Sequence, residues 1–170
     1  EELKLEITCG EAPFITGRYN PTAHTGIVIT PKNRVGFFDR KLQQVYKNVT
    51  SKKEWLEYAE IALKATYGYE WQGDNLLIAR ENVLLTLDDF YKDFCKRKLK
   101  LKSKQNLTDK QLERFAEIIS WNIFQMDGMR YVIPMSCKHI NRIIPGEYTL
   151  FGKTPDLVEK DECEGCKFNR

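Results

Sequence analysis

The apolar positions alternate strictly at the start of the chain. Leu3, Leu5 and Ile7 are apolar and are separated by Lys4 and Glu6, a period of two that predicts a β-strand. The alternation ends in a turn of small residues that contains a glycine. In open α/β sheets, a strand that leads into such a turn lets the backbone approach a nucleotide-like ligand at the carboxyl end of the strand. The start of the chain therefore predicts the first strand of an α/β sheet.

Two later segments have the character of further strands in the same sheet. Residues 67–71 contain Glu70 near their end, and residues 122–127 end in Asp127. Helical periodicity fills the intervals between the predicted strands. This alternation of strands and helices fits right-handed crossovers between parallel neighbours. We therefore expect three parallel strands, with helices on both faces of the sheet.

Capping signals and apolar stripes place the predicted helices. The first helix is expected from Asp39 to Asn48, and capping boxes at Ser51 and Thr108 predict the starts of two others. Asp74 is expected to cap the N-terminus of a longer helix. The apolar stripe of that helix, spaced by three and four residues, consists of Leu76, Ala79, Val83, Leu87, Phe90 and Phe94.

The segment around the first turn resembles a known cofactor motif. Residues 5–14 (LEITCGEAPF) resemble the first motif of N6-adenine DNA methyltransferases, in which an acid, a cysteine and a Gly-x-Gly turn lead to a bulky apolar residue. Residues 69–80 look like the second motif of that family, and residues 122–128 look like the third. The resemblance covers about residues 3–134. It implies a Rossmann-like, S-adenosylmethionine-dependent methyltransferase fold of the α/β class, with a partial parallel sheet flanked by helices.

The resemblance also implies S-adenosylmethionine as the cofactor. A carboxylate at the position of Glu70 accepts both ribose hydroxyls in nucleotide sites of this kind. Trp71 would lie against the adenine, and Asp127 would accept a hydrogen from its amino group. The alternatives are an exposed strand-end glutamate, a core tryptophan and an ordinary Asp-Gly turn. The implied cofactor-binding residues are Glu6, Thr8, Cys9, Gly10, Ala12, Phe14, Glu70, Trp71, Asp127 and Gly128.

The implied reaction of the complete protein is methyl transfer to adenine N6 in DNA, as part of a bacterial restriction–modification system, with the base flipped into a pocket. The family's catalytic tetrapeptide, Asn/Asp-Pro-Pro-Tyr/Phe, does not occur in these 170 residues. We therefore assign no catalytic residue and expect the tetrapeptide to lie outside this chain. The chain alone is expected to be inactive on DNA.

Composition narrows the classes of protein only slightly. Apolar residues make up 42% and charged residues 30% of the chain, as in soluble globular proteins. The net charge of +3 permits a nucleic-acid partner without arguing for one. The basic run 96–104 has two interpretations. It either binds the phosphate backbone of a nucleic acid, or it forms the solvent-exposed C-terminal end of a helix. No apolar run reaches the roughly 20 residues of a membrane span, and a cytoplasmic location is expected.

The remaining segments carry weaker signals. Residues 15–35 predict a long excursion beside the cofactor site, where Arg18 and Tyr19 either contact a ligand or are ordinary surface residues. The domain implied by the resemblance ends near residue 135, and residues 136–170 are expected to form an irregular tail, with one short strand from Tyr148 to Phe151.

The five cysteines do not have the spacing of a disulfide framework, which favours reduced thiols. Cys163 and Cys166 have the spacing of zinc ligands, and Cys137 and His139 can complete a set of four. Free thiols are the alternative for this pair. His24 and His139 have no nucleophile arrangement near them, so neither is assigned a catalytic role. Two other functions stay open: a non-catalytic nucleoside-binding scaffold, and a zinc-containing module that binds nucleic acid.

The strand order of the family predicts an open edge. Its first strand lies between the second strand and a fourth strand that has no counterpart here. Residues 3–7 would therefore carry unpaired backbone groups along one side. We expect this edge to be hidden by self-association through residues 3–7, or by residues 140–160 folding over it.

Overall fold

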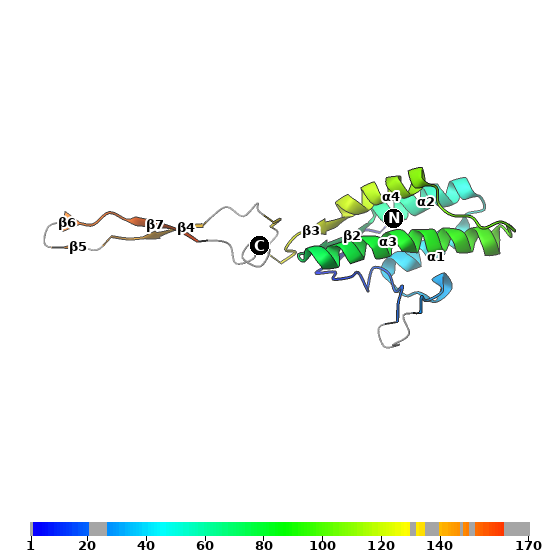
Figure 1. The fold of residues 1–170 in the computed structure, drawn as a ribbon, viewed down its shortest axis with the longest axis horizontal. Coiled ribbons are helices and arrows are strands. Elements are labelled where there is room, and N and C mark those ends of the chain that lie inside the picture. The colour runs from blue at the N-terminus through cyan, green and yellow to red at the C-terminus, as the bar shows by residue number, and fades with distance from the viewer. Residues whose placement is uncertain are drawn as a thin grey trace.

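The computed structural model describes residues 2–20, 27–129, 132–134, 140–146, 148–149 and 152–161. A parallel sheet of three strands, in the order β1-β2-β3, forms the centre of a mixed α/β unit (Figure 1). The strands are β1 (Lys4–Ile7), β2 (Thr66–Glu70) and β3 (Ile123–Gln125). The predicted parallel strands are confirmed, and β1 lies beside β2 at the edge of the described sheet.

The described residues form four α-helices beside this sheet: α1 (Phe37–Asn48), α2 (Lys52–Lys64), α3 (Gly73–Asp93) and α4 (Asp109–Asn122). A short 3-10 turn, η1 (Pro31–Asn33), precedes α1, and a π-helical turn, η2 (Phe94–Lys98), extends α3. Both predicted capping boxes are confirmed, at the starts of α2 and α4. The predicted apolar stripe of the long helix is also confirmed, because all six of its residues are buried.

The start of α3 differs from the prediction. The helix begins at Gly73 with Gln72 as its N-cap residue, so Asp74 lies inside the first turn and is not the cap. The Glu70 carboxylate accepts a hydrogen bond of 2.9 Å from the Gln72 amide, which turns the chain directly after β2. Because of this turn, the helix begins at Gly73, before the predicted cap residue. Asp74 still interacts favourably with the helix dipole.

The two faces of the sheet differ in their burial. Thr66 and Glu70 of β2 point to one face and are 0% and 5% exposed. Leu5 and Ile7 of β1 point to the opposite face and remain 48% and 42% exposed, and Tyr69, beside Ile7 in the register, is only partly buried. The core therefore lies on one face, and the prediction of helices on both faces is wrong.

Short connections explain why one face stays open. Ala65 alone separates α2 from β2, and α4 ends at Asn122, directly before β3. A helix needs a loop to fold back over the strand that follows it. Without such loops, α2 and α4 lie in line with the strands that follow them, on the amino-end side of the sheet. α3 is the helix that runs back along the sheet (Figure 1).

The C-terminal part of the chain contains a regular hairpin. β4 (Ile140–Ile144) pairs antiparallel with β7 (Leu157–Asp161), and β5 (Tyr148–Thr149) pairs with β6 (Gly152–Lys153). The prediction of an irregular tail is therefore wrong for these residues. Gly152, the first residue of β6, has a φ of 118°, a conformation that glycine adopts without steric cost. The paired strands extend away from the helices in Figure 1, so they do not cover β1.

Candidate functional site

The turn after β1 has an unusual backbone. Thr8, Gly10 and Ala12 all have positive φ angles, of 61°, 53° and 67°. For residues other than glycine this conformation costs roughly 1–3 kcal/mol each, and it persists only where the surroundings enforce it. The Cys9 amide donates to the Tyr69 carbonyl at 2.8 Å, which fixes the turn to the end of β2. Strain of this kind is typical of functional sites.

Glu70 joins the first two predicted motifs. Its side chain lies at the end of β2, and the residue is 5% exposed. One carboxylate oxygen accepts a hydrogen bond of 2.7 Å from the Gly10 amide, and the other accepts one of 2.9 Å from the Gln72 amide. Each oxygen keeps capacity for a further donor. Glu70 therefore holds the strained turn in place and can still accept hydrogen bonds from a ligand.

The third predicted motif, residues 122–128, packs against the carboxyl end of the sheet. The Met126 amide donates to the Glu70 carbonyl at 3.0 Å. Beyond it, an added Cβ at Gly128 would lie 2.4 Å from Cγ2 of Ile7, so only glycine allows this close approach to β1. Asp127 accepts a hydrogen bond of 3.0 Å from the Met129 amide within its own turn. Ends of all three strands thus meet, as the resemblance implies.

Burial divides the predicted cofactor residues into two groups. Cys9 and Ala12 are 1% and 0% exposed, so their side chains pack inside the protein and only their backbone can reach a ligand. Burial, with the charges of Glu6 and Glu70, raises the pKa of the Cys9 thiol to about 12. Cys9 is therefore a protonated packing residue at neutral pH. The remaining predicted residues of this segment lie at least partly at the surface: Glu6, Thr8, Gly10 and Phe14.

Gly10 leaves room for a ligand at the turn. An added Cβ there would meet no described atom within 4 Å. Trp71, next to Glu70, is partly buried, and its carbonyl accepts a hydrogen bond of 3.0 Å from Gln125. The turn and the end of β2 therefore present an open surface of backbone groups beside a large aromatic residue.

Glu6 has an incompletely satisfied carboxyl group. The Ile15 amide donates a hydrogen bond to this group, while Oε2 of Glu6 is buried and has no partner among the described residues. Burial raises the pKa of Glu6 to about 7. At neutral pH this residue is therefore divided between its neutral and charged forms, and a cation or a hydrogen-bond donor beside it would stabilise the charged form.

A buried polar network supports the segment after the turn. The Asp39 carboxylate accepts hydrogen bonds from the amides of Gly17 and Gly36, at 2.7 and 3.0 Å. Thr16 connects this carboxylate to the Thr86 hydroxyl of α3, at 3.1 and 2.7 Å. Sequence reasoning missed this network. The polar residues at 16, 39 and 86 give no local sign that they meet.

Arg18 belongs to the edge of the same network. Its Nε pairs with Asp89 of α3 at 3.1 Å, and its guanidinium lies 5.0 Å from the centre of the Tyr19 ring. The buried Arg34 pairs with the same carboxylate at 2.6 Å. These contacts fix the excursion to α3. They give Arg18 a structural role, while its predicted contact with a ligand stays a prediction.

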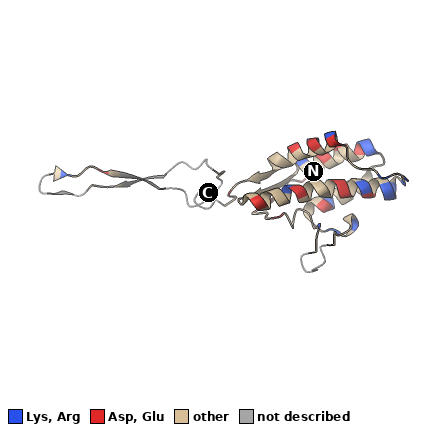
Figure 2. Ribbon diagram, in the orientation of Figure 1, with Lys and Arg blue, Asp and Glu red and all other residues tan. Residues whose placement is uncertain are grey.

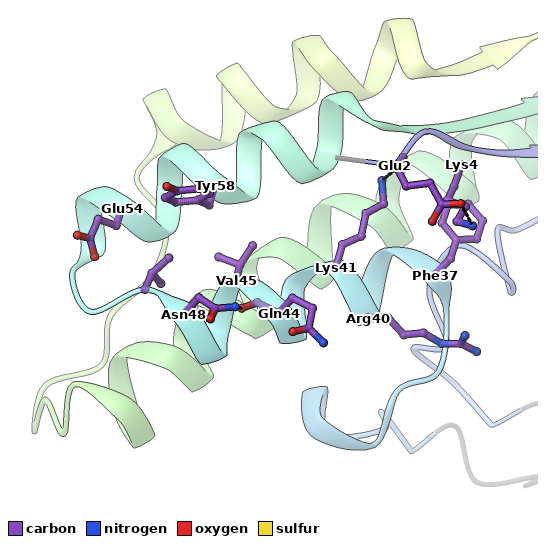
Figure 3. Close-up of a pocket in the computed structure, with 11 residues that line it drawn as sticks. Glu2, Lys4, Phe37, Arg40, Lys41, Gln44, Val45, Asn48, Glu54 and Tyr58 are labelled. Carbon is purple, nitrogen blue, oxygen red and sulfur yellow. Dashed lines mark hydrogen bonds and ion pairs between the residues drawn. The ribbon is translucent and has the colours of Figure 1, made fainter.

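A wide hollow in the described part of the structure lies away from this site. It has a volume of about 790 Å³ and lies beside α1, α2 and the amino end of β1 (Figure 3). Lys41 extends beside it and donates to the carbonyls of Glu2 and Ala65, at 2.7 and 2.8 Å. These polar groups hold the start of β1 against the helices. These contacts serve the packing of β1, and size alone does not make the hollow a site.

The basic run ends α3 far from the candidate site, as the blue segments of Figure 2 show. Lys98 donates to the carbonyls of Tyr46 and Lys47 at the end of α1, at 2.6 and 2.8 Å. Arg97 pairs with Asp93 at 2.8 Å. Part of this charge therefore serves the helix ends, in line with the simpler of the two interpretations of the sequence.

The predicted zinc ligands Cys163, Cys166, Cys137 and His139, and also His24, lie outside the described residues. Within the described ranges, no cluster of three or more His, Cys, Asp or Glu residues is arranged to hold a metal. Cys9 and Cys95 are buried free thiols. In the same part of the chain, no helix has the length and apolar character needed to cross a membrane. The zinc site stays a prediction.

No protein-family model matches the chain, and neither a curated protein nor a solved structure matches it. The geometry at the carboxyl end of the sheet and the resemblance of the motifs are therefore the two features that indicate a function.

Proposed function

We propose that this chain is the S-adenosylmethionine-binding portion of a DNA adenine-N6 methyltransferase of a restriction–modification system. The observation that carries the proposal is the hydrogen bond from the Gly10 amide to the Glu70 carboxylate. It joins two of the motifs that resemble this family, although they lie 60 residues apart in sequence. The third motif, at Asp127 and Gly128, packs at the same end of the sheet.

The proposed roles follow from the position of each group. Glu70 would accept the ribose hydroxyls with the hydrogen-bonding capacity that the two amides leave free. Trp71 would cover the adenine, and Asp127 would accept a hydrogen from its amino group. The exposed backbone near Gly10 would face the methionine end. Bound S-adenosylmethionine would supply a methyl group made electrophilic by its sulfonium.

The conformation of the turn supports a binding role. Two residues other than glycine, Thr8 and Ala12, have positive φ angles on either side of Gly10. A packing turn would be more stable without this strain. A bound ribose would need open space beside the turn and a carboxylate that accepts its hydroxyls. Gly10 provides the space, and the buried Glu70 provides the carboxylate. A non-catalytic nucleoside-binding subunit would use the same groups and is the second candidate.

The ribose contact can be tested apart from any structural role of Glu70. Because Glu70 holds two backbone amides, its replacement is expected to alter stability as well as binding. We would therefore titrate adenosine and 2′,3′-dideoxyadenosine calorimetrically into the wild type and into Glu70→Gln. The wild type should prefer adenosine by about tenfold or more, the equivalent of one charge-assisted hydrogen bond. Glu70→Gln should lose most of this preference.

A matched control and a second substrate complete the test. Glu57→Gln, at an exposed position of α2, should keep the wild-type preference. Equal preferences in the wild type and in Glu70→Gln would remove Glu70 from the ribose site. Methyl transfer from labelled S-adenosylmethionine to DNA by a longer protein that contains this chain would separate the methyltransferase from the nucleoside-binding scaffold.

A further inference from the structure

β1 and Leu3, the residue before it, carry apolar side chains along an edge of the described sheet. Leu3, Leu5 and Ile7 are 70%, 48% and 42% exposed. β1 has β2 as its neighbour on one side, and no described strand lies on the other. An apolar edge strand of this kind is a template for pairing with another chain.

The direction of the backbone groups defines what can pair there. The Lys4 amide donates to the Ala65 carbonyl at 3.0 Å, so the backbone of Lys4 faces β2. Along a strand, successive residues direct their N–H and C=O groups to opposite sides. The backbone groups of Leu3, Leu5 and Ile7 therefore point to the open edge. These are also the three residues with exposed apolar side chains.

The sequence of this strand is self-complementary when it is read in both directions from Leu5. Lys4 and Glu6 carry opposite charges at equal distances from Leu5, and Leu3 and Ile7 are apolar at the next positions. We propose that β1 pairs antiparallel with β1 of a second copy of this chain, centred on Leu5. This interface has a two-fold axis and uses the edge of β1 that faces away from β2.

The pairing satisfies the outward backbone groups. Leu5 would exchange both hydrogen bonds with Leu5 of the second copy, and Leu3 would do so with Ile7. These are the hydrogen-bonded pairs of an antiparallel ladder. Lys4 and Glu6 would then form the alternate pairs, in which side chains lie closest together. A parallel pairing in register would instead place Lys4 beside Lys4.

The present contacts of Glu6 and Lys4 leave both side chains available for an ion pair with a second copy. Oε2 of Glu6 is buried without a partner among the described residues. The Lys4 ammonium pairs with Glu2 at 2.7 Å, at an exposed position where such pairs contribute little. Figure 3 shows this pair at the amino end of β1. A second copy would bring each Lys4 to the Glu6 carboxyl group whose Oε2 lacks a partner among the described residues.

Charge reversal provides the test. Lys4→Glu would place two acids in each cross-strand pair, and Glu6→Lys would place two lysines there. In light scattering and sedimentation, the wild type should form dimers, and each single variant should associate at least tenfold more weakly. An equimolar mixture of the two variants should recover the wild-type affinity as a heterodimer, because each pair is again Lys with Glu. The double variant Lys4→Glu/Glu6→Lys should recover it as a homodimer.

Control variants separate pairing from folding. Lys53→Glu and Glu57→Lys reverse charges on the surface of α2 and should dimerise like the wild type. Leu5→Pro removes an outward N–H that β2 does not use and should abolish dimers while the parallel sheet remains. A wild type that stays monomeric at high concentration, or a mixture that does not recover affinity, would overturn the proposal. Protection of the residue 3–7 amides in such a monomer would identify another segment as the cover.

Discussion

The amino and carboxyl ends of the parallel sheet differ in how the chain is held there. At the amino ends of β2 and β3, helices run directly into the strands, and Asn122 joins them by donating to the carbonyls of Leu63 and Thr66 at 2.9 and 3.0 Å. At the carboxyl ends, Thr8 and Ala12 hold strained conformations around a buried carboxylate.

A hollow of about 790 Å³ lies toward the amino end of the sheet, whereas the strained turn and the unused hydrogen-bonding capacity of Glu70 lie at the carboxyl end. Backbone conformation and hydrogen-bonding groups therefore indicate a site in this protein, and the size of a hollow does not. If the two ends differ in this way, substitutions at the amino end should change stability alone. Substitutions at the carboxyl end should change stability and ligand binding by separate amounts.

The largest effect is expected in the helical core beyond the amino ends. Trp55 of α2 is fully buried, with its ring centre 5.2 Å from that of Tyr91. Trp55→Ala should lower the free energy of unfolding by about 3–5 kcal/mol through the cavity that it leaves. Denaturant titration measures this change. Adenosine affinity at low temperature, where the variant is folded, should stay at the wild-type value.

Trp55→Phe is the matched control for this prediction. The indole Nε1 is buried and has no partner among the described residues, so its removal loses no hydrogen bond within them. Phenylalanine should therefore restore most of the stability. A phenylalanine variant as unstable as the alanine variant would contradict the packing explanation.

At the carboxyl end, Gly128→Ala should destabilise the protein by about 1–3 kcal/mol, because its Cβ would lie 2.4 Å from Cγ2 of Ile7. Ile7→Ala removes that methyl group. The double variant should therefore be more stable than the sum of the two single changes predicts, as a double-mutant cycle of denaturant titrations would show. Strict additivity of the two changes would mean that the third motif does not pack on β1.

Local signals explain which parts of this fold the sequence predicts. The capping boxes at Ser51 and Thr108 and the buried stripe of α3 depend on residues three or four apart, and the structure confirms them. The single covered face depends on the length of the connections at Ala65 and Asn122, which periodicity does not register. The strands β4 (INRII) and β7 (LVEKD) do not alternate apolar and polar residues, so the sequence predicts an irregular tail there.

The candidate site was predictable only as separate motifs. Resemblance placed Gly10, Glu70 and Asp127 near one another, but the hydrogen bond between Glu70 and Gly10 required the structure. The side chains of Cys9 and Ala12 turn inward, although the sequence placed both residues at the cofactor. Contacts between residues far apart in sequence, such as those of Asp39, leave no pattern in the chain.

A smaller effect is expected from relief of strain at the turn. Thr8 has a φ of 61°, which glycine adopts without cost. Thr8→Gly should therefore raise the free energy of unfolding, by about 1 kcal/mol or less once the greater freedom of glycine in the unfolded chain is included. Thr50→Gly, at an exposed position with extended neighbours, should lower stability instead. A loss of stability at both positions would show that the turn is not strained.

The smallest effect is a dependence of stability on pH through Glu6. Burial raises the pKa of this carboxyl group in the folded protein from its ordinary value of 4.5 to about 7. The folded state therefore holds the proton more tightly than the unfolded chain. The stabilisation from this group is complete below pH 4.5 and is lost as the pH rises to about 7. Because the side chain is partly exposed to solvent, we expect a change of about 1 kcal/mol or less. Urea titrations of dilute protein between these pH values should show this slope in the wild type, and Glu6→Gln should remove it. The same slope in both proteins would assign the pH dependence to other groups, such as Asp39, whose pKa burial also raises.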